Sequence, residues 1–349
     1  MTVTIGRHRL ATDAPCFVVA ELSGNHNGDL GRAVATVEAA AEAGAHAIKL
    51  QTYTPDTITL DCDGPEFRVA GNGPWGGRRL WDLYREAHTP WDWHPRLFEV
   101  ARACGLEVFS TPFDGTAVAF LESLGAPAYK IASFELVDDG LLRQVAATGK
   151  PVVVSTGMAS LEEISHAVAV LERAGVTELV LLRCTSSYPA PDDDMHLRTI
   201  PLLAELTGHP VGLSDHSIGV VAPVVAVSLG ARMIEKHLTL DRAAGGVDSH
   251  FSLEPAEFRA LVTAVARAEL MLGAPTFGPG VAEEGSVAFR RSLYLAEDVR
   301  AGDRLTERNV RSVRPGHGLP PRFADLVIGK AARRDARRGT PVTWDLVTS

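Results

Sequence analysis

Short apolar runs alternate with longer helical stretches through the first 277 residues, and few folds accommodate such a repeat. The runs, interpreted as strands, lie at residues 17–20, 47–50, 107–110, 128–131, 151–155, 178–182, 211–214 and 233–237. Most of the intervening stretches have helical apolar spacing, as in 32–43 and 161–174. Several of them end at a glycine, as helices often do. Parallel strands covered on both faces are apolar throughout, and eight strand–helix units close a barrel. The sequence therefore predicts an α/β fold, a (β/α)8 TIM barrel, over residues 1–277.

Polar side chains stand at the C-terminal end of nearly every predicted strand. They include Glu21, Lys49, Gln51, Ser110, Thr111, Lys130, Ser133, Ser155, Thr156, Cys184, Ser214, Asp215, His216, Glu235, Lys236 and His237. In a parallel barrel these ends all face one mouth, where the loops build the active site. The regular phase of these residues predicts an enzyme with its site at that mouth.

Two of these residues are histidines on neighbouring strands. His216 closes the seventh predicted strand and His237 closes the eighth, so the two imidazoles can share one divalent metal ion. Two imidazoles completed by carboxylate or water suit Mn²⁺, Co²⁺ or Zn²⁺, and Mg²⁺ less well. Glu21 ends the first strand, which lies next to the eighth in a closed barrel. A lone histidine at a strand end is usually a core side chain, but two beside acids indicate a metal or acid–base role.

A second group combines lysines with hydroxyls. Its members are Lys49, Thr111, Lys130, Ser133, Ser155 and Ser214. Lysine supplies a point charge and Ser/Thr supply hydrogen-bond donors, so this set predicts a cradle for phosphate or carboxylate. A lysine at a barrel strand end can instead form a Schiff base, and Lys49, Lys130 and Lys236 are the candidates.

Composition excludes several other classes of protein. The hydrophobic fraction of 46% and charged fraction of 22% are those of a soluble globular protein. The net charge of −9 argues against nucleic-acid binding, and no stretch reaches the ~20 apolar residues of a membrane span. None of the four cysteines forms a C-x-x-C pair, so we expect a reducing, cytoplasmic location.

Two segments depart from the regular alternation of strands and helices. A long insertion, residues 52–93, carries Trp75, Trp81, Trp91 and Trp93 and is expected to form a lid or binding wall. Residues 278–288 are interpreted as a linker, and 289–349 as a small, mostly β domain. Residues 285–349 carry 13 Lys and Arg against 7 Asp and Glu, whereas residues 1–284 have a net charge of −15. This basic part is either a solvated surface or a source of arginine for an anionic ligand or an acidic partner.

Seven motifs occur in order along the barrel: AELSGNHNG (20–28), AIKLQ (47–51), FSTPFD (109–114), YKIAS (129–133), STGM (155–158), GLSDH (212–216) and IEKH (234–237). Together they resemble the sialic acid synthase family, whose members are transferases that condense phosphoenolpyruvate with an amino-sugar aldehyde. RSLY (291–294) and RSVRPG (311–316) resemble the antifreeze-like (SAF) domain of that family. Within the family, QTYTPD (51–56), LYREAHTPWDWH (83–94) and DSHFSLEP (248–255) resemble the pseudaminate branch. The neuraminate and legionaminate branches, which use the same chemistry, are the alternatives.

The resemblance implies a role for individual residues. It implies His216 and His237 as metal ligands, with Mn²⁺ expected and Co²⁺ or Mg²⁺ as alternatives, and Glu21 close to the reacting carbons. It implies that phosphoenolpyruvate is held by Lys49, Thr111, Lys130, Ser133, Ser155 and Ser214, and the sugar by Gln51, Glu135, Tyr188 and Arg314. Arg314 would reach the partner's barrel in a domain-swapped homodimer. Cys184 stands where neuraminate synthases tend to carry an amide, so no role is carried over to it.

Two functions of other classes compete with this hypothesis. One is a Schiff-base aldolase on the same barrel. The other is a carbohydrate- or ice-binding protein in which the C-terminal module is the active part. The paired histidines argue against a binder, which has no need of them.

Overall fold

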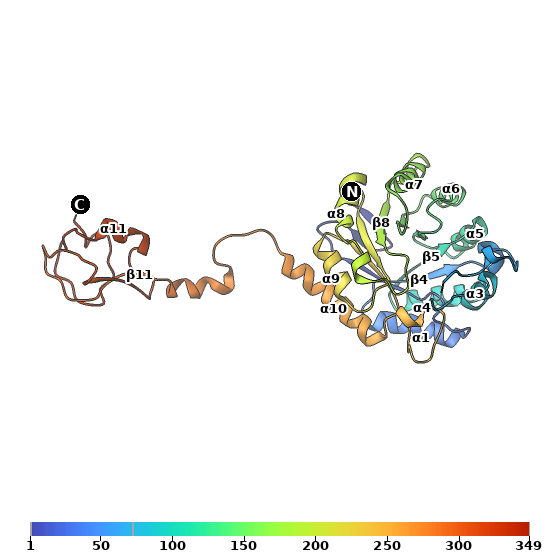
Figure 1. Ribbon diagram of the computed structural model, residues 1–349, viewed down its shortest axis with the longest axis horizontal. Coiled ribbons are helices and arrows are strands. Elements are labelled where there is room, and N and C mark those ends of the chain that lie inside the picture. The colour runs from blue at the N-terminus through green and yellow to red at the C-terminus, as the bar shows by residue number, and fades with distance from the viewer. Residues whose placement is uncertain (1, 72, 349) are drawn as a thin grey trace. The chain divides into compact units, whose positions relative to one another are not determined.

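The computed structural model describes residues 2–71 and 73–348, which form two compact units, Met1–Gly273 and Ala274–Ser349 (Figure 1). The division falls four residues before the end of the barrel domain expected from the sequence. The predicted linker at 278–288 is largely a 3₁₀ helix, Val281–Phe289. No helix among the described residues combines the length and the apolar character needed to cross a membrane.

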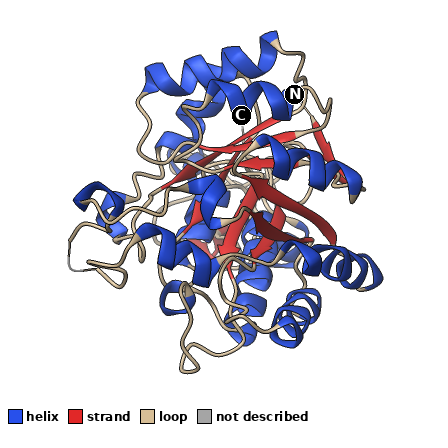
Figure 2. Ribbon diagram, turned by 90° about the vertical axis from the view of Figure 1, so that its right-hand side faces the viewer, coloured by secondary structure: helices blue, strands red, loops and turns tan. Residues whose placement is uncertain are grey.

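The first unit is a closed barrel of eight parallel strands, which confirms the predicted fold (Figure 2). Its strands are β3 (Phe17–Glu21), β4 (Ala47–Thr52), β5 (Glu107–Pro112), β6 (Tyr129–Ile131), β7 (Val152–Ser155), β8 (Leu179–Cys184), β9 (Val211–Asp215) and β10 (Met233–His237). β10 pairs with both β9 and β3, which closes the sheet. The strands are buried almost throughout, as a sheet covered by helices requires.

Helices alternate with these strands and cover the outside of the barrel. They are α1 (Leu30–Glu42), α4 (His94–Ala103), α5 (Gly115–Ser123), α6 (Asp139–Ala146), α7 (Leu161–Arg173), α8 (Thr199–Thr207), α9 (Val221–Ser228) and α10 (Pro255–Leu272). Asp29, Asp114 and Asp138 each cap the helix that follows, so the chain turns sharply from the mouth of the barrel into a helix. Glycines follow several of these helices, as expected from the sequence, and those at 44, 105, 125, 149, 175 and 230 all have positive φ.

A short antiparallel hairpin precedes the barrel and was not anticipated from the sequence. Its strands, β1 (Val3–Ile5) and β2 (His8–Leu10), bury Val3, Ile5 and Leu10 against residues inside the barrel. That interior is filled by Phe17, Val19, Ala47, Phe109, Ala128, Val153, Val180, Leu182 and Met233. The barrel is therefore packed with side chains beneath its mouth.

The insertion after β4 carries two short helices, α2 (Pro55–Ile58) and α3 (Leu80–Ala87), and two 3₁₀ turns, Pro65–Phe67 and Trp91–Trp93. Trp75 in this insertion donates a hydrogen bond from Nε1 to the carbonyl of Val247, 2.9 Å away. The insertion is therefore fastened to the loop that follows β10.

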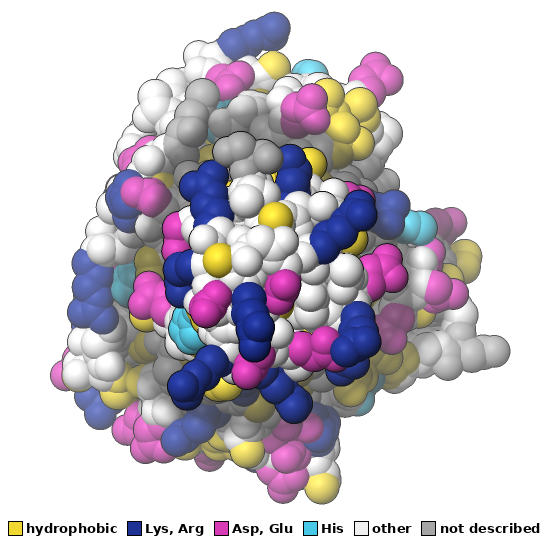
Figure 3. All heavy atoms as spheres, turned by 90° about the vertical axis from the view of Figure 1, so that its left-hand side faces the viewer, with side chains coloured by type: hydrophobic (Ala, Val, Ile, Leu, Met, Phe, Trp, Pro, Cys, Tyr) yellow, Lys and Arg dark blue, Asp and Glu magenta, His cyan; other side chains and the backbone are white. Residues whose placement is uncertain are grey.

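The second unit has its own core around Leu293, Leu305 and Val342. It contains the strand pair β11 (Ser292–Leu295) and β12 (Val310–Val313), the helix α11 (Ala324–Val327) and isolated β-bridges. Residues 305–309 and 340–346 of this mostly β domain are loops and turns with a single-residue bridge at Pro341. Lys and Arg side chains, dark blue in Figure 3, are interspersed with acidic ones.

Candidate active site

The register of the barrel strands brings several of the predicted strand-end residues side by side. Glu21 at the end of β3 lies opposite His237 of β10 on one side and Lys49 of β4 on the other. Ser214 of β9 lies opposite Glu235 of β10. These side chains therefore meet at the C-terminal mouth, as the topology predicts.

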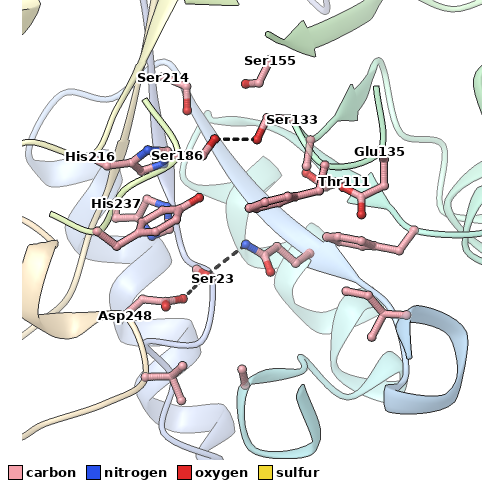
Figure 4. Close-up of a pocket in the computed structure, with 18 of the residues that line it drawn as sticks. Ser23, Thr111, Ser133, Glu135, Ser155, Ser186, Ser214, His216, His237 and Asp248 are labelled. Atoms are coloured by element: carbon pink, nitrogen blue, oxygen red, sulfur yellow. Dashed lines mark hydrogen bonds between the residues drawn. The ribbon is translucent and has the colours of Figure 1, made fainter. Parts of the chain in front are cut away.

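A cavity of about 600 Å³ opens at this mouth (Figure 4). It is lined by Lys49, Gln51, Thr111, Lys130, Ser133, Glu135, Ser155, Tyr188, Ser214, His216 and His237, all predicted from the sequence. Glu21 does not line the cavity but contacts two residues that do, Lys49 and Gln51. Arg314 belongs to the second unit, where it follows β12 and is exposed.

Two lysines form the charged floor of the cavity. Lys49 Nζ lies 2.6 Å from a carboxylate oxygen of Glu21 and 3.2 Å from the hydroxyl of Thr111. Lys130 Nζ donates to the Ser155 hydroxyl at 2.7 Å. Burial lowers the pKa of Lys130. Burial acts in the same direction on Lys49, but the neighbouring carboxylates outweigh it and raise its pKa. The floor can therefore present ammonium and hydroxyl donors to an anion.

Glu235, which the sequence analysis placed at a strand end without a role of its own, lies close to both lysines. Glu235 accepts a hydrogen bond from Ser214 at 2.8 Å and lies 3.9 Å from Lys49 and 4.0 Å from Lys130. The alternation of side chains along β10 was the available signal, because residues 235 and 237 share a face. Lys236 faces the other way and pairs with Asp215 outside the cavity lining. Of the three Schiff-base candidates, only Lys49 and Lys130 line the cavity.

The two histidines lie together on one side of the cavity, opposite Thr111 and Glu135 in Figure 4. Their ring centroids are 5.4 Å apart. His216 Nδ1 donates to the carbonyl of Thr185 at 3.1 Å, which leaves Nε2 as its free acceptor. Burial lowers the pKa of His237 well below its usual range, and the His216 ring adds to this effect.

These properties fit a metal site that is open to substrate. His237 Nδ1 is buried and, within the described part of the chain, has no hydrogen-bond partner. Neutral imidazole is the form that binds transition metals, and the lowered pKa of His237 favours this form for that ring. No third His, Cys, Asp or Glu completes a ligand cluster among residues 2–71 and 73–348. An ion held here would take its remaining ligands from substrate and water.

The other lining residues suit a polar, partly apolar ligand. Burial raises the pKa of Glu135 to about 7, and its Oε2 is buried with no partner in the described structure. The Tyr188 ring lies 4.5 Å from that of His216 and 5.5 Å from that of Trp75. An apolar wall, not identified from the sequence beyond the insertion itself, consists of Ile58, Val69, Leu80, Leu83, Phe113 and Phe134.

Two further lining residues come from loops and were also missed. Ser23 follows β3, and Asp248 precedes a 3₁₀ turn at Ser249–Phe251; the Ser23 hydroxyl donates to the Asp248 carboxylate. Ser186, in the loop after β8, also lines the cavity and shares a hydrogen bond with Ser133 at 2.9 Å. The only signal of Ser23 and Asp248 in the sequence was their position within longer motifs.

A closed parallel β/α barrel whose C-terminal mouth carries lysines, hydroxyls and paired imidazoles has the layout of a barrel enzyme. The NeuB family model matches residues 36–276, and the SAF domain model matches residues 290–348. The chain belongs to the NeuB family and carries a C-terminal SAF domain.

Individual relatives agree with this assignment. The chain is 45% identical over 328 residues to the pseudaminic acid synthase of Campylobacter jejuni, covering 94% of this chain and 95% of that protein. It is 34% identical over 335 residues to the N,N'-diacetyllegionaminic acid synthase of Legionella pneumophila, covering 95% of this chain and 94% of that protein. The crystal structure of N-acetylneuraminic acid synthetase from Leptospira borgpetersenii in complex with citrate superposes with a TM-score of 0.73 at 33% identity, covering 82% of this chain and 95% of that one.

Proposed function

We propose that this protein is a transferase that condenses phosphoenolpyruvate with 2,4-diacetamido-2,4,6-trideoxy-β-L-altropyranose and water to give pseudaminic acid and phosphate. The observation that carries this proposal is that one cavity joins the lysine and hydroxyl floor to the paired imidazoles and the apolar wall. The higher identity to the pseudaminic acid synthase than to the legionaminic acid synthase supports the branch.

The residues at the floor of the cavity would bind phosphoenolpyruvate. Lys49 and Lys130 would supply the positive charge for its phosphate and carboxylate. The hydroxyls would supply hydrogen bonds that fix its orientation: Thr111, Ser133, Ser155 and Ser214. Charge-assisted hydrogen bonds in a site with little water are about twice as strong as neutral ones, so this arrangement favours a multiply charged anion.

The reaction joins C3 of phosphoenolpyruvate to the aldehyde carbon of the open-chain sugar, and the aldehyde oxygen takes up a proton. Positive charge then develops at C2, where the buried carboxylate of Glu21 would stabilise it. Water adds at C2 and releases a proton. The bond between C2 and the phosphate oxygen breaks, which leaves a ketone and free phosphate. His216 and His237 would hold the divalent ion, Mn²⁺ in our proposal and Co²⁺ or Mg²⁺ as alternatives, whose chemistry is Lewis-acid polarisation of the aldehyde.

The apolar wall supports a deoxy sugar with two acetamido groups. Ile58, Leu80 and Leu83 come from the insertion and offer hydrocarbon to the C6 methyl and the acetyl methyls. Gln51, Glu135 and Tyr188 offer polar atoms in the same cavity. N-acetylmannosamine would place a C6 hydroxyl against hydrocarbon, where an unpaired polar group is costly. Legionaminate synthase, whose substrate differs in stereochemistry, is the second candidate.

We also propose a homodimer in which the SAF domain of one subunit serves the barrel of the other through Arg314. Large apolar side chains on either side of the division between the two units support it. Leu270, Met271, Phe277, Val281 and Phe289 are all exposed, and such a stretch is expected to be covered by protein. Sedimentation of a monomer that retains full activity would contradict this. All four cysteines are free, which supports a cytoplasmic location.

The decisive experiment measures phosphate release from phosphoenolpyruvate with three sugars: the altrose derivative, the legionaminate precursor and N-acetylmannosamine. We expect the altrose derivative to have the highest kcat/KM. Release with none of them would refute the condensation. Treatment with pyruvate and borohydride separates the aldolase alternative, because only a Schiff-base enzyme gains a covalent adduct.

A further inference from the structure

Ser23 has a backbone conformation that is unusual for its residue type. In the described structure, three non-glycine residues have positive φ: Ser23 at 48°, Asn27 at 51° and His196 at 45°. Glycine adopts this region without the steric cost that a Cβ brings. Strained residues of this kind persist where their surroundings hold them, and they cluster at functional sites. Of the three, only Ser23 lines the cavity.

The Ser23 side chain joins two groups that line the cavity, the carboxylate of Asp248 in the loop after β10 and the amide of Gln51 on β4. Its hydroxyl donates to Oδ2 of Asp248, and the same oxygen of Asp248 accepts from the backbone N–H of Gly24 at 3.3 Å. The Ser23 oxygen in turn accepts from Nε2 of Gln51 at 3.0 Å. The Ser23–Asp248 bond and the bond from the amide to Ser23 are dashed in Figure 4.

These bonds fix the direction of the Gln51 amide. Nε2 has two hydrogens, and it donates one to Glu21 at 3.1 Å and the other to Ser23 at 3.0 Å. The amide oxygen is then the polar atom that remains for a ligand. Asp248, held by Ser23 and Gly24, is a second acceptor on the same side. The cavity therefore presents two acceptors to a molecule that carries N–H and O–H donors.

We propose that Ser23 is a positioning residue that aims the Gln51 amide oxygen and the Asp248 carboxylate at the acetamido N–H and hydroxyl donors of the amino sugar. The inference rests on the proposed function, because it concerns the sugar side of that cavity. It also explains why serine, and not glycine, occupies a left-handed position. Glycine would remove the strain, but it would leave the carboxylate and the amide without the group that joins them.

Two substitutions separate positioning from stability. Ser23→Ala keeps the strain and removes the hydroxyl, whereas Ser23→Gly removes both. Ser23→Gly should therefore have the higher Tm of the two. Both should raise the KM for the sugar roughly tenfold, as expected for a lost hydrogen bond to a charged group, and leave the KM for phosphoenolpyruvate unchanged. His196→Gly is the matched control, because it relieves an exposed left-handed residue and should change neither KM.

If the KM for the sugar followed Tm, so that Ser23→Gly behaved like wild type, Ser23 would be a structural residue and the inference would be wrong. Crystal structures of Ser23→Ala and the wild type give a second readout that needs no turnover. We expect the Asp248 carboxylate and the Gln51 amide to move apart in the variant, and unmoved side chains would overturn the inference. A wild type that turns over no amino sugar would refute the proposed function instead, and the crystal structures would still decide the positioning role.

Discussion

Replacing Lys236 with methionine should destabilise the barrel more than any surface substitution. Lys236 Nζ lies 2.5 Å from Oδ2 of Asp215, and both side chains are 0% exposed. The ammonium also donates to the carbonyl of Ser217. Methionine fills a similar volume but leaves Asp215 as a buried charge without its counter-ion. Breaking such a pair from one side costs about 3–5 kcal/mol.

Thermal unfolding followed by calorimetry measures this loss. For a domain of this size, about 1 kcal/mol corresponds to a Tm change of roughly 2–4 °C, so we expect the transition of the barrel to fall by roughly 6–20 °C. Lys150→Met is the matched control. Its ion pair with Glu122 has the same length, 2.5 Å, but the side chains are 26% and 40% exposed, so its loss should cost less than about 1 kcal/mol.

The double variant Lys236→Met/Asp215→Leu completes the cycle, because it removes the stranded charge along with its partner. It should recover most of the lost stability. Asp215 precedes His216 and Lys236 precedes His237, so we also expect Lys236→Met to weaken Mn²⁺ binding measured by electron paramagnetic resonance. A single variant as stable as the wild type, or a double variant no better than the single one, would refute the reasoning.

The remaining predictions concern the cavity. His237→Ala should lose Mn²⁺ binding, measured by the resonance of free Mn²⁺, together with metal-dependent phosphate release, while its circular dichroism stays native; retained binding would contradict the ligand assignment. Burial raises the pKa of Glu135 from about 4.5 to about 7 in the folded protein, so as the pH rises this carboxyl ionises first in the unfolded chain. The stability of the wild type should therefore fall relative to that of Glu135→Gln between pH 4.5 and 7. A difference in Tm that stays constant over this range would argue against a buried neutral carboxyl. Gly157→Ala should raise the KM for phosphoenolpyruvate at least about tenfold, because the new Cβ would stand 2.3 Å from Cβ of Ser133. Gly175→Ala, which also has positive φ but nothing within 4 Å, should lose only stability.

The barrel could be predicted because its signal is long-range and redundant. Eight apolar runs that alternate regularly with helical stretches are compatible with few folds. The first and last residues of individual strands were predicted less accurately. The run predicted at 178–182 continues as a strand to Cys184, since the strand extends into the polar residues that form the mouth. The hairpin of β1 and β2 was missed because strands of three residues are too short to show a period.

The site residues, like the strands, fall into those that the sequence could place and those that it could not. Those at strand ends, such as Lys49 and His237, could be placed from topology alone. Ser23 and Asp248 could not, because they lie in loops whose course depends on capping and on contacts with other loops. Lys236 shows the remaining limit: without the alternation along β10, its neighbours in the sequence suggest a cavity lysine, whereas it points away from the cavity.

The chemistry of the mouth depends on the register of β10. In the observed register, His237 stands opposite Glu21, and Glu235 opposite Ser214. Successive side chains of a strand point to opposite faces, so a slip of one residue would turn Lys236 into the cavity and the histidine out of it. The buried pair of Lys236 and Asp215 opposes that slip, because a one-residue shift of β10 would take Lys236 away and leave the Asp215 carboxylate buried without its counter-ion. An ion pair that touches neither substrate therefore specifies which face of β10 meets the cavity, and with it the approach of His237 to His216.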